Sequence, residues 1–399
     1  MRRLSLLCLP AAVVAVQIPS QSTLSVGPGG FPQIRDALAA AQPGDTLLVQ
    51  PGTYAHFDAT IGVTIRAAVP GTVEVVYDPA FTPPGCQMSL VCMSTEGPTH
   101  LAPPSGQPLH VIGLNFLPTA TPIGLLNAFH RVAIDSGTVT MDDCVIRSAG
   151  SSALSVTDAV VSLQGCTIRN ESANGVFSSG ALLDGATVTM VDCTVIGGPA
   201  SPGLYPGGDG LRVIQSSVHA SGLLVRGGSS QMQAGGPAVR AASGAIWISD
   251  SQLEAGNAAC AVAVTSAVVQ LARCNVVNAS LSCGQPATAP LLGVHRPQPL
   301  TLGGTFVLEF RTDPNGFVFL SASPDLIGAP LLETVQPLSL HPASLVFAGV
   351  FFADANGVAS GAWNVPNNPA LVDATLWFQG ATGFSFPLQM TPVAGGVMR

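Results

Sequence analysis

Short segments of alternating hydrophobic and polar residues fill most of the chain between positions 109 and 276, and one eight-residue pattern recurs in them. The pattern is Val, any residue, Leu or Met, two residues, Cys, any residue, then Ile or Val. It occurs at 139–146, 161–168, 188–195 and 269–276. Three further segments fit it with Leu or Ser in the Cys place, at 109–116, 218–225 and 246–253. The shortest spacing between successive copies is 22 residues, from position 144 to position 166.

A second ladder of apolar residues runs in step with the first. Its rungs are Val132 with Ile134, Leu154 with Val156, Val176, Leu211 with Val213, Val239, and Val262 with Val264. Each repeat therefore contains three short alternating segments separated by Gly, Ser, Asp or Asn, which is the pattern of strands joined by turns. Residues one repeat apart would stack in parallel strands ~4.8 Å apart. The repeat predicts a parallel β-helix, since leucine-rich repeats need a different consensus and propeller repeats are longer.

The N-terminal segment adds a resemblance to a known family. Residues 31–41 carry Ile34 and Leu38 at helical spacing, and Pro-Gly-Asp and Gly-Thr-Tyr motifs follow them. With the repeats, these motifs make residues 24–285 resemble the right-handed parallel β-helix (pectin lyase-like) superfamily, in which a short amphipathic helix caps the first coil. A solenoid needs such a cap, because its first coil would otherwise leave apolar residues and strand edges open. The resemblance implies the fold alone, because this fold carries lyases, hydrolases, isomerases, adhesins and inert shafts.

The sequence changes character after Pro286, where the ladder stops. Gln285 to Gln298 is rich in proline, and residues 286–298 are therefore predicted to be a linker. Alternating or apolar strands follow, joined by Asp-Pro-Asn-Gly and Asp-Ala-Asn-Gly turns that suit hairpins. Residues 299–399 are predicted to form a small β-sandwich-like domain. The fold class is therefore all-β: a capped parallel β-helix followed by this domain.

The first residues carry the features of a secretory signal peptide. Two Arg residues precede an apolar stretch, and small residues near position 15 suit cleavage, so 1–15 is predicted to be removed on export. The apolar stretch is shorter than the ~20 residues that span a bilayer, so we expect a secreted or bacterial cell-surface protein with no membrane insertion after cleavage. Export leaves eight cysteines in an oxidising compartment. The predicted disulfide pairs are Cys86 with Cys92 and Cys260 with Cys283.

Charge excludes one class of partner. Charged residues make up 9% of the chain, the net charge is -8, and all 14 basic residues are Arg. No basic stripe is available to neutralise phosphates, so nucleic acid is not expected as a partner.

Insertions point to a binding surface. Segments 117–129, 197–209 and 227–237 lengthen the same turn of their repeats, and the last two should form a lip beside the helix. Loops raised from one face of a solenoid commonly bind ligands; the alternative is that insertions accumulate at a permissive turn. The predicted ligand-binding residues in and near this lip are Tyr205, Asp209, Arg212, Arg226 and Arg240.

Arginine residues recur at outward positions of the repeat. Arg212 and Arg240 lie one repeat apart, and Arg147, Arg169 and Arg226 share another outward position. Such a column suits bidentate contacts with uronate carboxylates. The alternative is that each Arg pairs with a nearby Asp on a solvated face.

No complete catalytic set accompanies the fold. Asp142-Asp143 is the only adjacent acidic pair, whereas glycoside hydrolysis needs two carboxylates placed around the substrate. Lyase chemistry would need calcium ligands and a base, but no acidic cluster supports calcium, and no Lys is present. His130 with Arg131 is a weak alternative site. No cofactor is identified, and the inward Cys144 column is predicted to hold buried thiols and no metal.

Two functions remain open. The first is a secreted, non-catalytic protein that binds a polysaccharide or cell-surface glycan or serves as an adhesin. The second is a polysaccharide-degrading enzyme, a lyase or a glycoside hydrolase, with a divergent site. Convergence of at least three ionisable side chains within hydrogen-bond reach of one another in one groove would distinguish the second from the first.

Overall fold

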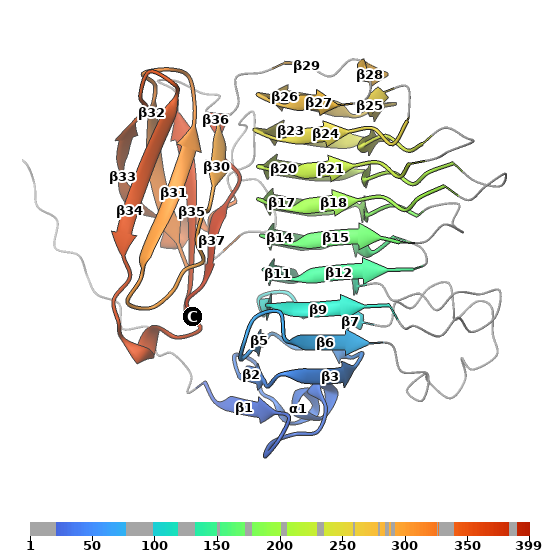
Figure 1. Ribbon diagram of the computed structural model, residues 1–399. Coiled ribbons are helices and arrows are strands. Elements are labelled where there is room, and N and C mark those ends of the chain that lie inside the picture. Colours follow the sequence, from blue (N-terminus) through green and yellow to red (C-terminus); the bar gives the residue numbers. More distant parts are fainter. Residues whose placement is uncertain are drawn as a thin grey trace, which may run out of the picture.

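The computed structural model describes residues 21–76, 99–118, 132–149, 152–171, 178–200, 206–229, 235–257, 260–277, 280–283, 287–288, 292–324, 326, 339–382 and 389–399. In these residues the chain winds into coils that build three stacked parallel sheets, named here sheets A, B and C. Figure 1 shows the coils stacked along one axis, with the C-terminal domain beside them. This is the predicted right-handed parallel β-helix. Among these residues, no helix is long and apolar enough to cross a membrane.

Each full coil contributes one strand to each sheet, in the order A, B, C. Sheet A contains β1 (Thr23–Val26), β2 (Thr46–Val49), β5 (Thr64–Ala67), β8 (Leu109–Ile112), β11 (Thr138–Asp142), β14 (Val160–Gln164), β17 (Thr187–Val191), β20 (Ser216–Ser221), β23 (Gly244–Ser249), β26 (Val268–Ala272) and β29 (Ala287–Thr288). Sheet B contains β3 (Gly52–Ala55), β6 (Val73–Val76), β9 (Leu114–Leu117), β12 (Val145–Ser148), β15 (Thr167–Asn170), β18 (Thr194–Ile196), β21 (Leu224–Arg226), β24 (Gln252–Glu254) and β27 (Asn275–Val277). Sheet C contains β4 (Asp58–Ala59), β7 (Thr99–Leu101), β10 (Val132–Ile134), β13 (Leu154–Thr157), β16 (Ala181–Asp184), β19 (Leu211–Ile214), β22 (Val239–Ala241), β25 (Cys260–Val264) and β28 (Ser280–Cys283).

The predicted Val ladder lies inside the coils. Val139 pairs in register with Val161, which pairs with Val188, and all three are buried. Val269 is buried on the same face of sheet A. Because parallel strands repeat every ~4.8 Å, each of these side chains packs on its equivalents one coil away. The predicted register of sheet A is confirmed.

One rung of the second ladder was placed wrongly. The sheet C strand after β13 is β16, so Ala181 and Leu183 pair with Leu154 and Val156. Val176, which had been assigned to this rung, lies outside the described residues. The error arose because an insertion carries a Val at the phase expected for the shortest coil. The long turn between sheets B and C therefore also occurs in this coil.

The helix α1 (Ile34–Ala40) caps the first coil, as predicted. Ile34, Ala37 and Leu38 are buried. Gln33 precedes the helix, and its side-chain oxygen accepts a hydrogen bond of 2.8 Å from the backbone N–H of Ala55. The helix thus covers the apolar end of the solenoid and is tied to sheet B.

The C-terminal domain contains two antiparallel sheets packed face to face. One sheet contains β30 (Gly293–His295), β31 (Thr305–Arg311) and β34 (Val358–Asn364), and the other contains β33 (Val346–Phe352), β32 (Phe317–Ser323), β35 (Thr375–Thr382), β36 (Gln389–Met390) and β37 (Ala394–Val397). Two short 3₁₀ turns, η2 (Pro342–Ser344) and η3 (Pro369–Leu371), lie between strands. Phe306 of the first sheet stacks on Phe378 of the second, with 5.4 Å between the ring centroids. Aromatic side chains therefore form part of the core between the two sheets.

The segment predicted to be a linker, 286–298, contributes strands to both domains. β29 at its start pairs with β26 of sheet A, and β30 pairs with β31 of the C-terminal domain. Its prolines do not prevent this, because they flank the short strands.

A ridge of residues in the left-handed conformation marks the turn between sheets A and B. One residue of each successive coil has a positive φ at this turn. These residues and their φ values are Asp143 (51°), Gly165 (60°), Asp192 (53°), Gly222 (69°) and Asp250 (49°). The Asp and Gly residues alternate for a steric reason. A Cβ on Gly165 would lie 2.4 Å from Oδ1 of Asp143, and one on Gly222 would lie 2.2 Å from Oδ1 of Asp192. We call this series the Asp ridge.

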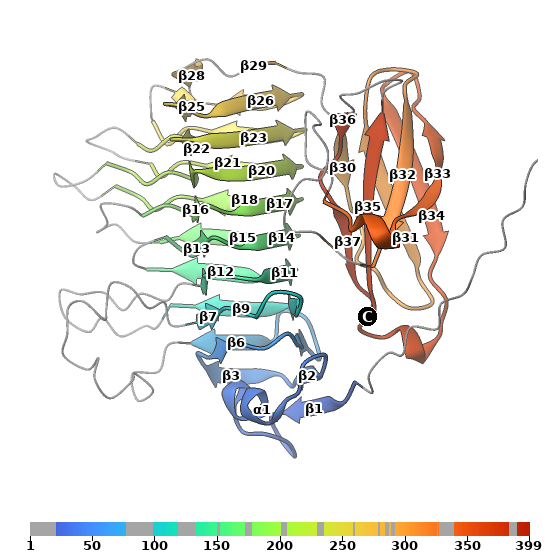
Figure 2. The same cartoon turned by 180° about the vertical axis from the view of Figure 1, so that it is seen from behind.

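The C-terminal domain docks at the start of the Asp ridge, through ion pairs with Asp143 and with its buried neighbour Asp142. Nη2 of Arg296 lies 2.5 Å from Oδ1 of Asp142, and these side chains are 4% and 1% exposed. Nη2 of Arg399 lies 2.5 Å from the other oxygen of Asp142, and its Nη1 lies 3.0 Å from Asp143. Figure 2 shows β30 and β37 lying beside the sheet A strands. The contact fixes one arrangement of the two domains, since an unpaired charge at this depth would be costly.

Candidate functional site

The long turns between sheets B and C leave the coils as arms whose bases pack backbone to backbone. The N–H of Gly208 donates to the carbonyl of Gly198 at 2.9 Å, Gly228 donates to Gly208 at 2.7 Å, and Gly236 donates to Gly228 at 2.9 Å. A Cβ on Gly228 would lie 1.7 Å from the carbonyl oxygen of Gly198. Only glycine allows this approach, so the base of the predicted lip is closely packed. We call these segments the glycine arms.

Arg212 and Arg240 lie beside the glycine arms as predicted, in register on β19 and β22. Arg240, however, already holds a carboxylate. Its Nε lies 2.8 Å and 3.0 Å from the two oxygens of Asp209, whose side chain is 7% exposed, whereas Arg240 is 45% exposed. The expectation of two adjacent Arg side chains, both available to a uronate, is therefore wrong for Arg240. The returning arm ends at Asp209, one coil before Arg240, and this proximity makes the pair.

Arg226 is also paired. Its Nε donates to Glu254, the residue in register on the next coil, and this hydrogen bond lowers the pKa of Glu254. The side chain of Glu254 is 10% exposed, and that of Arg226 is 49% exposed. Arg147 and Arg169 both lie near Glu171, at 2.8 Å and 3.5 Å. Four of the outward Arg side chains, Arg147, Arg169, Arg226 and Arg240, therefore lie against carboxylates, as in the alternative interpretation of the sequence.

Other predicted positions fall inside or outside the described residues. Cys260 and Cys283 form the predicted disulfide, which joins β25 to β28 in the last coil. The remaining predicted residues, namely Tyr205, His130, Arg131, Cys86 and Cys92, lie outside the described residues.

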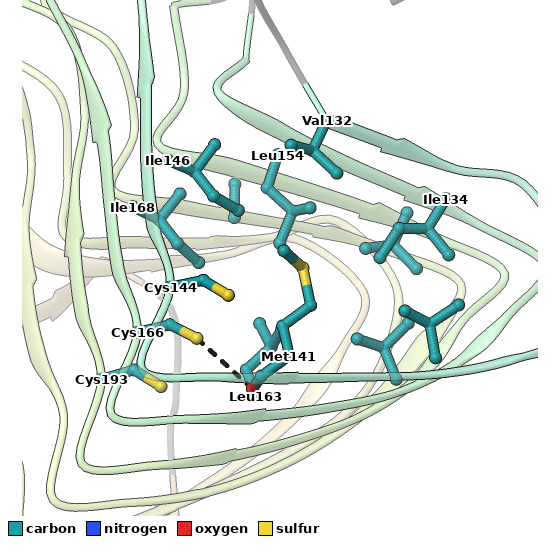
Figure 3. Close-up of a cluster of buried hydrophobic side chains, with 14 of the residues drawn as sticks. Val132, Ile134, Met141, Cys144, Ile146, Leu154, Leu163, Cys166, Ile168 and Cys193 are labelled. Carbon is teal, nitrogen blue, oxygen red and sulfur yellow. Dashed lines mark hydrogen bonds between the residues drawn. The ribbon is translucent and has the colours of Figure 1, made fainter. Parts of the chain in front are cut away.

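The inward cysteines are buried thiols, as predicted. Figure 3 shows Cys144, Cys166 and Cys193 in a column that points into the coil interior. All three are at most 1% exposed, and the thiol of Cys166 lies 3.4 Å from the carbonyl oxygen of Met141. In the part of the chain that the structure describes, no group of three or more His, Cys, Asp or Glu residues could hold a metal ion.

A second site, a cleft between the two domains, was not predicted from the sequence. It has a volume of about 420 Å³, within the range of roughly 300–1,000 Å³ typical of ligand sites. The β-helix provides one wall and the C-terminal domain the other. Its lining residues are Asp250, Ser251, Gln252, Arg273, Asn275, His295, Arg311, Thr312, Asn356 and Gly357.

His295 stands at this cleft in a hydrogen bond with the Asp ridge. Its Nδ1 lies 2.8 Å from Oδ1 of Asp192, and the other oxygen of Asp192 accepts the backbone N–H of Arg296 at 2.8 Å. The hydrogen bond to Asp192 raises the pKa of His295 above its usual value. The imidazole is 24% exposed, so Asp192 holds a partly accessible ring in a fixed orientation.

Arg273 belongs to the β-helix wall of the cleft and contacts the wall that the C-terminal domain provides. Its guanidinium makes two hydrogen bonds to Asp250, at 2.6 Å and 2.9 Å, and its Nη2 also donates to the carbonyl of Arg311 at 3.3 Å. Arg311 itself lies 3.7 Å from Glu309, which is longer than a hydrogen bond. The cleft therefore combines fixed, mutually paired groups with one guanidinium whose ion pair is loose.

These residues escaped sequence-based prediction because two domains supply them. Asp192 and His295 are 103 residues apart, and no local spacing links them. The sequence did contain a signal for the contact between the domains. Asp residues stand at the same turn position of alternate coils, and His295-Arg296 supplies basic side chains that can pair with them.

No protein-family model and no curated protein matches the sequence. Solved structures are similar in fold. The A-module of mannuronan C-5 epimerase AlgE4 from Azotobacter vinelandii is 12% identical, with a TM-score of 0.27, over 64% of this chain and 92% of that one. Pectin methylesterase from Aspergillus niger is 13% identical, with a TM-score of 0.29, over 68% and 92% of the two chains.

A viral protein, ORF18 of Geobacillus virus E2, is 9% identical, with a TM-score of 0.32, over 90% of this chain and 72% of that one. At these identities and scores, the similarities carry no inference about activity, ligand or partner. What the strand order itself establishes is the predicted architecture, a parallel β-helix built from three stacked parallel sheets.

Proposed function

We propose that the protein is a secreted, non-catalytic glycan-binding protein that binds a sugar chain on sheets B and C beside the glycine arms. One observation carries the proposal: Arg240 and Arg226 are each about half exposed and are each held by a nearly buried carboxylate. Such a pair presents N–H donors whose positions are already fixed, so little side-chain entropy is lost on binding.

The pairing selects among glycans. The charge of each Arg is balanced by its partner, which favours hydroxyl groups as ligands over carboxylates. A carboxylate that binds one Arg retains lone pairs and can still accept from a sugar hydroxyl. Successive coils repeat every ~4.8 Å, close to the length of one pyranose unit, so a chain laid along the stack would advance by about one sugar residue per coil.

The same pairing argues against hydrolysis on this surface. Glycosidases use one carboxyl group as an acid and another as a base or nucleophile. Asp209 and Glu254 are both bound to Arg side chains, and the hydrogen bond with Arg226 keeps Glu254 ionised by lowering its pKa. A carboxyl held in that state is a poor general acid.

The experiment is a binding screen of the purified protein against neutral and anionic polysaccharides, with assays for new reducing ends and new unsaturated ends on the same samples. We expect binding without new ends. The double variant Arg226→Ala/Arg240→Ala should lose at least ten-fold in affinity. The control Arg169→Ala, which changes an exposed Arg two coils away from Arg226, should bind as the parent does. Equal binding by the double variant, or release of new ends by the parent, would overturn the proposal.

A further inference from the structure

The cleft between the domains has the polar composition of a sugar site, and three basic side chains, Arg273, Arg311 and His295, line it. Each of them has a carboxylate neighbour, namely Asp250, Glu309 and Asp192 in turn, and the three contacts differ in tightness. We infer that this cleft is a second ligand site, separate from the glycine arms, and that its ligand is a sugar carrying a carboxylate group.

Arg311 is the group that would bind the carboxylate. Arg273 is committed to Asp250 through two hydrogen bonds, and His295 is committed to Asp192 through one. Arg311 makes a loose ion pair of 3.7 Å with Glu309, and both side chains are 38% exposed. Its charge also contributes to the lowered pKa of Asp354, after the hydrogen bonds that this carboxylate accepts within its own turn. A guanidinium in this state can exchange its weak ion pair for a bidentate contact with an incoming carboxylate.

The remaining lining residues suit hydroxyl groups. The β-helix contributes Gln252, Asn275 and Ser251 to this lining, and the C-terminal domain contributes Asn356 and Thr312. Amides and hydroxyls both donate and accept hydrogen bonds, as sugar hydroxyls do. This lining disfavours apolar ligands, because it lacks the hydrophobic side chains that line most ligand pockets.

His295 adds a charge that depends on pH. The groups that act on it are Asp192 and Asp250 on the β-helix, which raise its pKa, and Arg311 on the C-terminal domain, which lowers it. The net effect is a raised pKa, so the ring is protonated below that value and attracts an anionic ligand. Binding should weaken as the pH rises through the pKa of His295.

The site also assigns a role to the C-terminal domain. Neither wall is complete alone, because Asp250, Arg273 and Asn275 belong to the β-helix, whereas His295, Arg311 and Asn356 belong to the other domain. Docking on the Asp ridge therefore assembles the cleft.

The test uses the full chain and two matched probes, galacturonate and galactose, with binding followed by titration calorimetry and by ligand-observed NMR. We expect galacturonate to bind more tightly than galactose. Arg311→Gln should reduce galacturonate affinity at least ten-fold and leave galactose unchanged. Arg35→Gln removes the same charge from the cap helix, far from the cleft, and should have no effect. Acetate, a carboxylate without hydroxyls, should bind more weakly than galacturonate.

The result is separable from that of the glycine arms. Arg226→Ala/Arg240→Ala should keep galacturonate binding, and Arg311→Gln should keep polysaccharide binding. His295→Gln should bind galacturonate with an affinity that no longer falls as the pH rises from 6 to 8. The inference is overturned if galacturonate does not bind at millimolar concentrations, or if a stably folded Arg311→Gln or Asn356→Ala variant binds it as the parent does.

Discussion

Removing Arg296 should weaken the docking of the two domains far more than removing a surface Arg. Its guanidinium bonds to both oxygens of Asp142, at 2.5 Å and 3.2 Å, and to the carbonyl of Gly395 at 3.0 Å. Breaking a buried ion pair costs roughly 3–5 kcal/mol, because the remaining charge loses its partner. Asp142 keeps one hydrogen bond, from Arg399, so we expect about 3 kcal/mol, the lower end of that range, for Arg296→Met.

The assay is urea unfolding followed by tryptophan fluorescence. Trp363 and Trp377 lie in the C-terminal domain and report its transition, and Trp377 is 2% exposed. The control is Arg169→Met, whose side chain is 55% exposed and lies 3.5 Å from Glu171. An exposed pair of this kind is worth at most about 1 kcal/mol.

Adding Asp142→Leu to Arg296→Met should restore part of the lost stability, because the double change removes both buried charges of the pair. If Arg296→Met shifts the transition no more than Arg169→Met does, the buried pair does not hold the domains together and the reasoning is refuted.

Three further predictions concern stability. Ile168→Asp puts an unpaired carboxylate at a fully buried position, and it should lower the free energy of unfolding by several kcal/mol and loosen the adjacent coils as well as its own. If amide hydrogen exchange in the adjacent coils is the same as in the parent, the register is contradicted. Replacing Cys260 and Cys283 by Ser should cost roughly 3 kcal/mol, since their disulfide closes a separation of 23 residues, and reductant should lower the thermal midpoint of the variant less than that of the parent. Burial lowers the pKa of His110 to about 4 and of His219 to about 3. Unfolded His titrates near 6.5, so unfolding takes up protons below that pH. The free energy of unfolding should therefore fall by roughly 2–3 kcal/mol per His between pH 7 and 4.5. His219→Asn should flatten the fall in urea midpoint, and an unchanged slope would count against burial as its cause.

The fold was predictable because its information is local and repeated. The pattern that contains Val139 and Val161 recurs at intervals fixed by the coil, so each copy supports the others. Prediction failed where that support was missing. Val176 was placed in a strand on phase alone, and residues 293–295 were taken for linker because a three-residue strand between prolines has no periodicity of its own.

The candidate sites divide in the same way. The register of Arg212 and Arg240 follows from the repeat and was predicted, whereas the partner of Arg240 was not. Asp209 reaches it from a returning arm whose path depends on glycine packing against glycine. The cleft depends on docking between domains, which leaves no periodic trace in the sequence.

The Asp ridge connects these observations, because one series of turns serves docking and binding together. Asp residues two coils apart are separated by ~9.6 Å, while an extended chain advances ~3.3 Å per residue. Segment 293–296 therefore advances about 10 Å, or two coil spacings, and its side chains bridge the rest of the distance between the Asp residues that it contacts. Gly293 lies against Asp250, His295 bonds to Asp192, and the long side chain of Arg296 reaches Asp142. A Cβ at position 293 would lie 1.7 Å from Oδ2 of Asp250, so glycine is needed for the chain to approach this closely. The same ridge residue, Asp250, holds Arg273 at the wall of the cleft, and any change that displaces segment 293–296 should therefore loosen the domains and disturb the cleft at once.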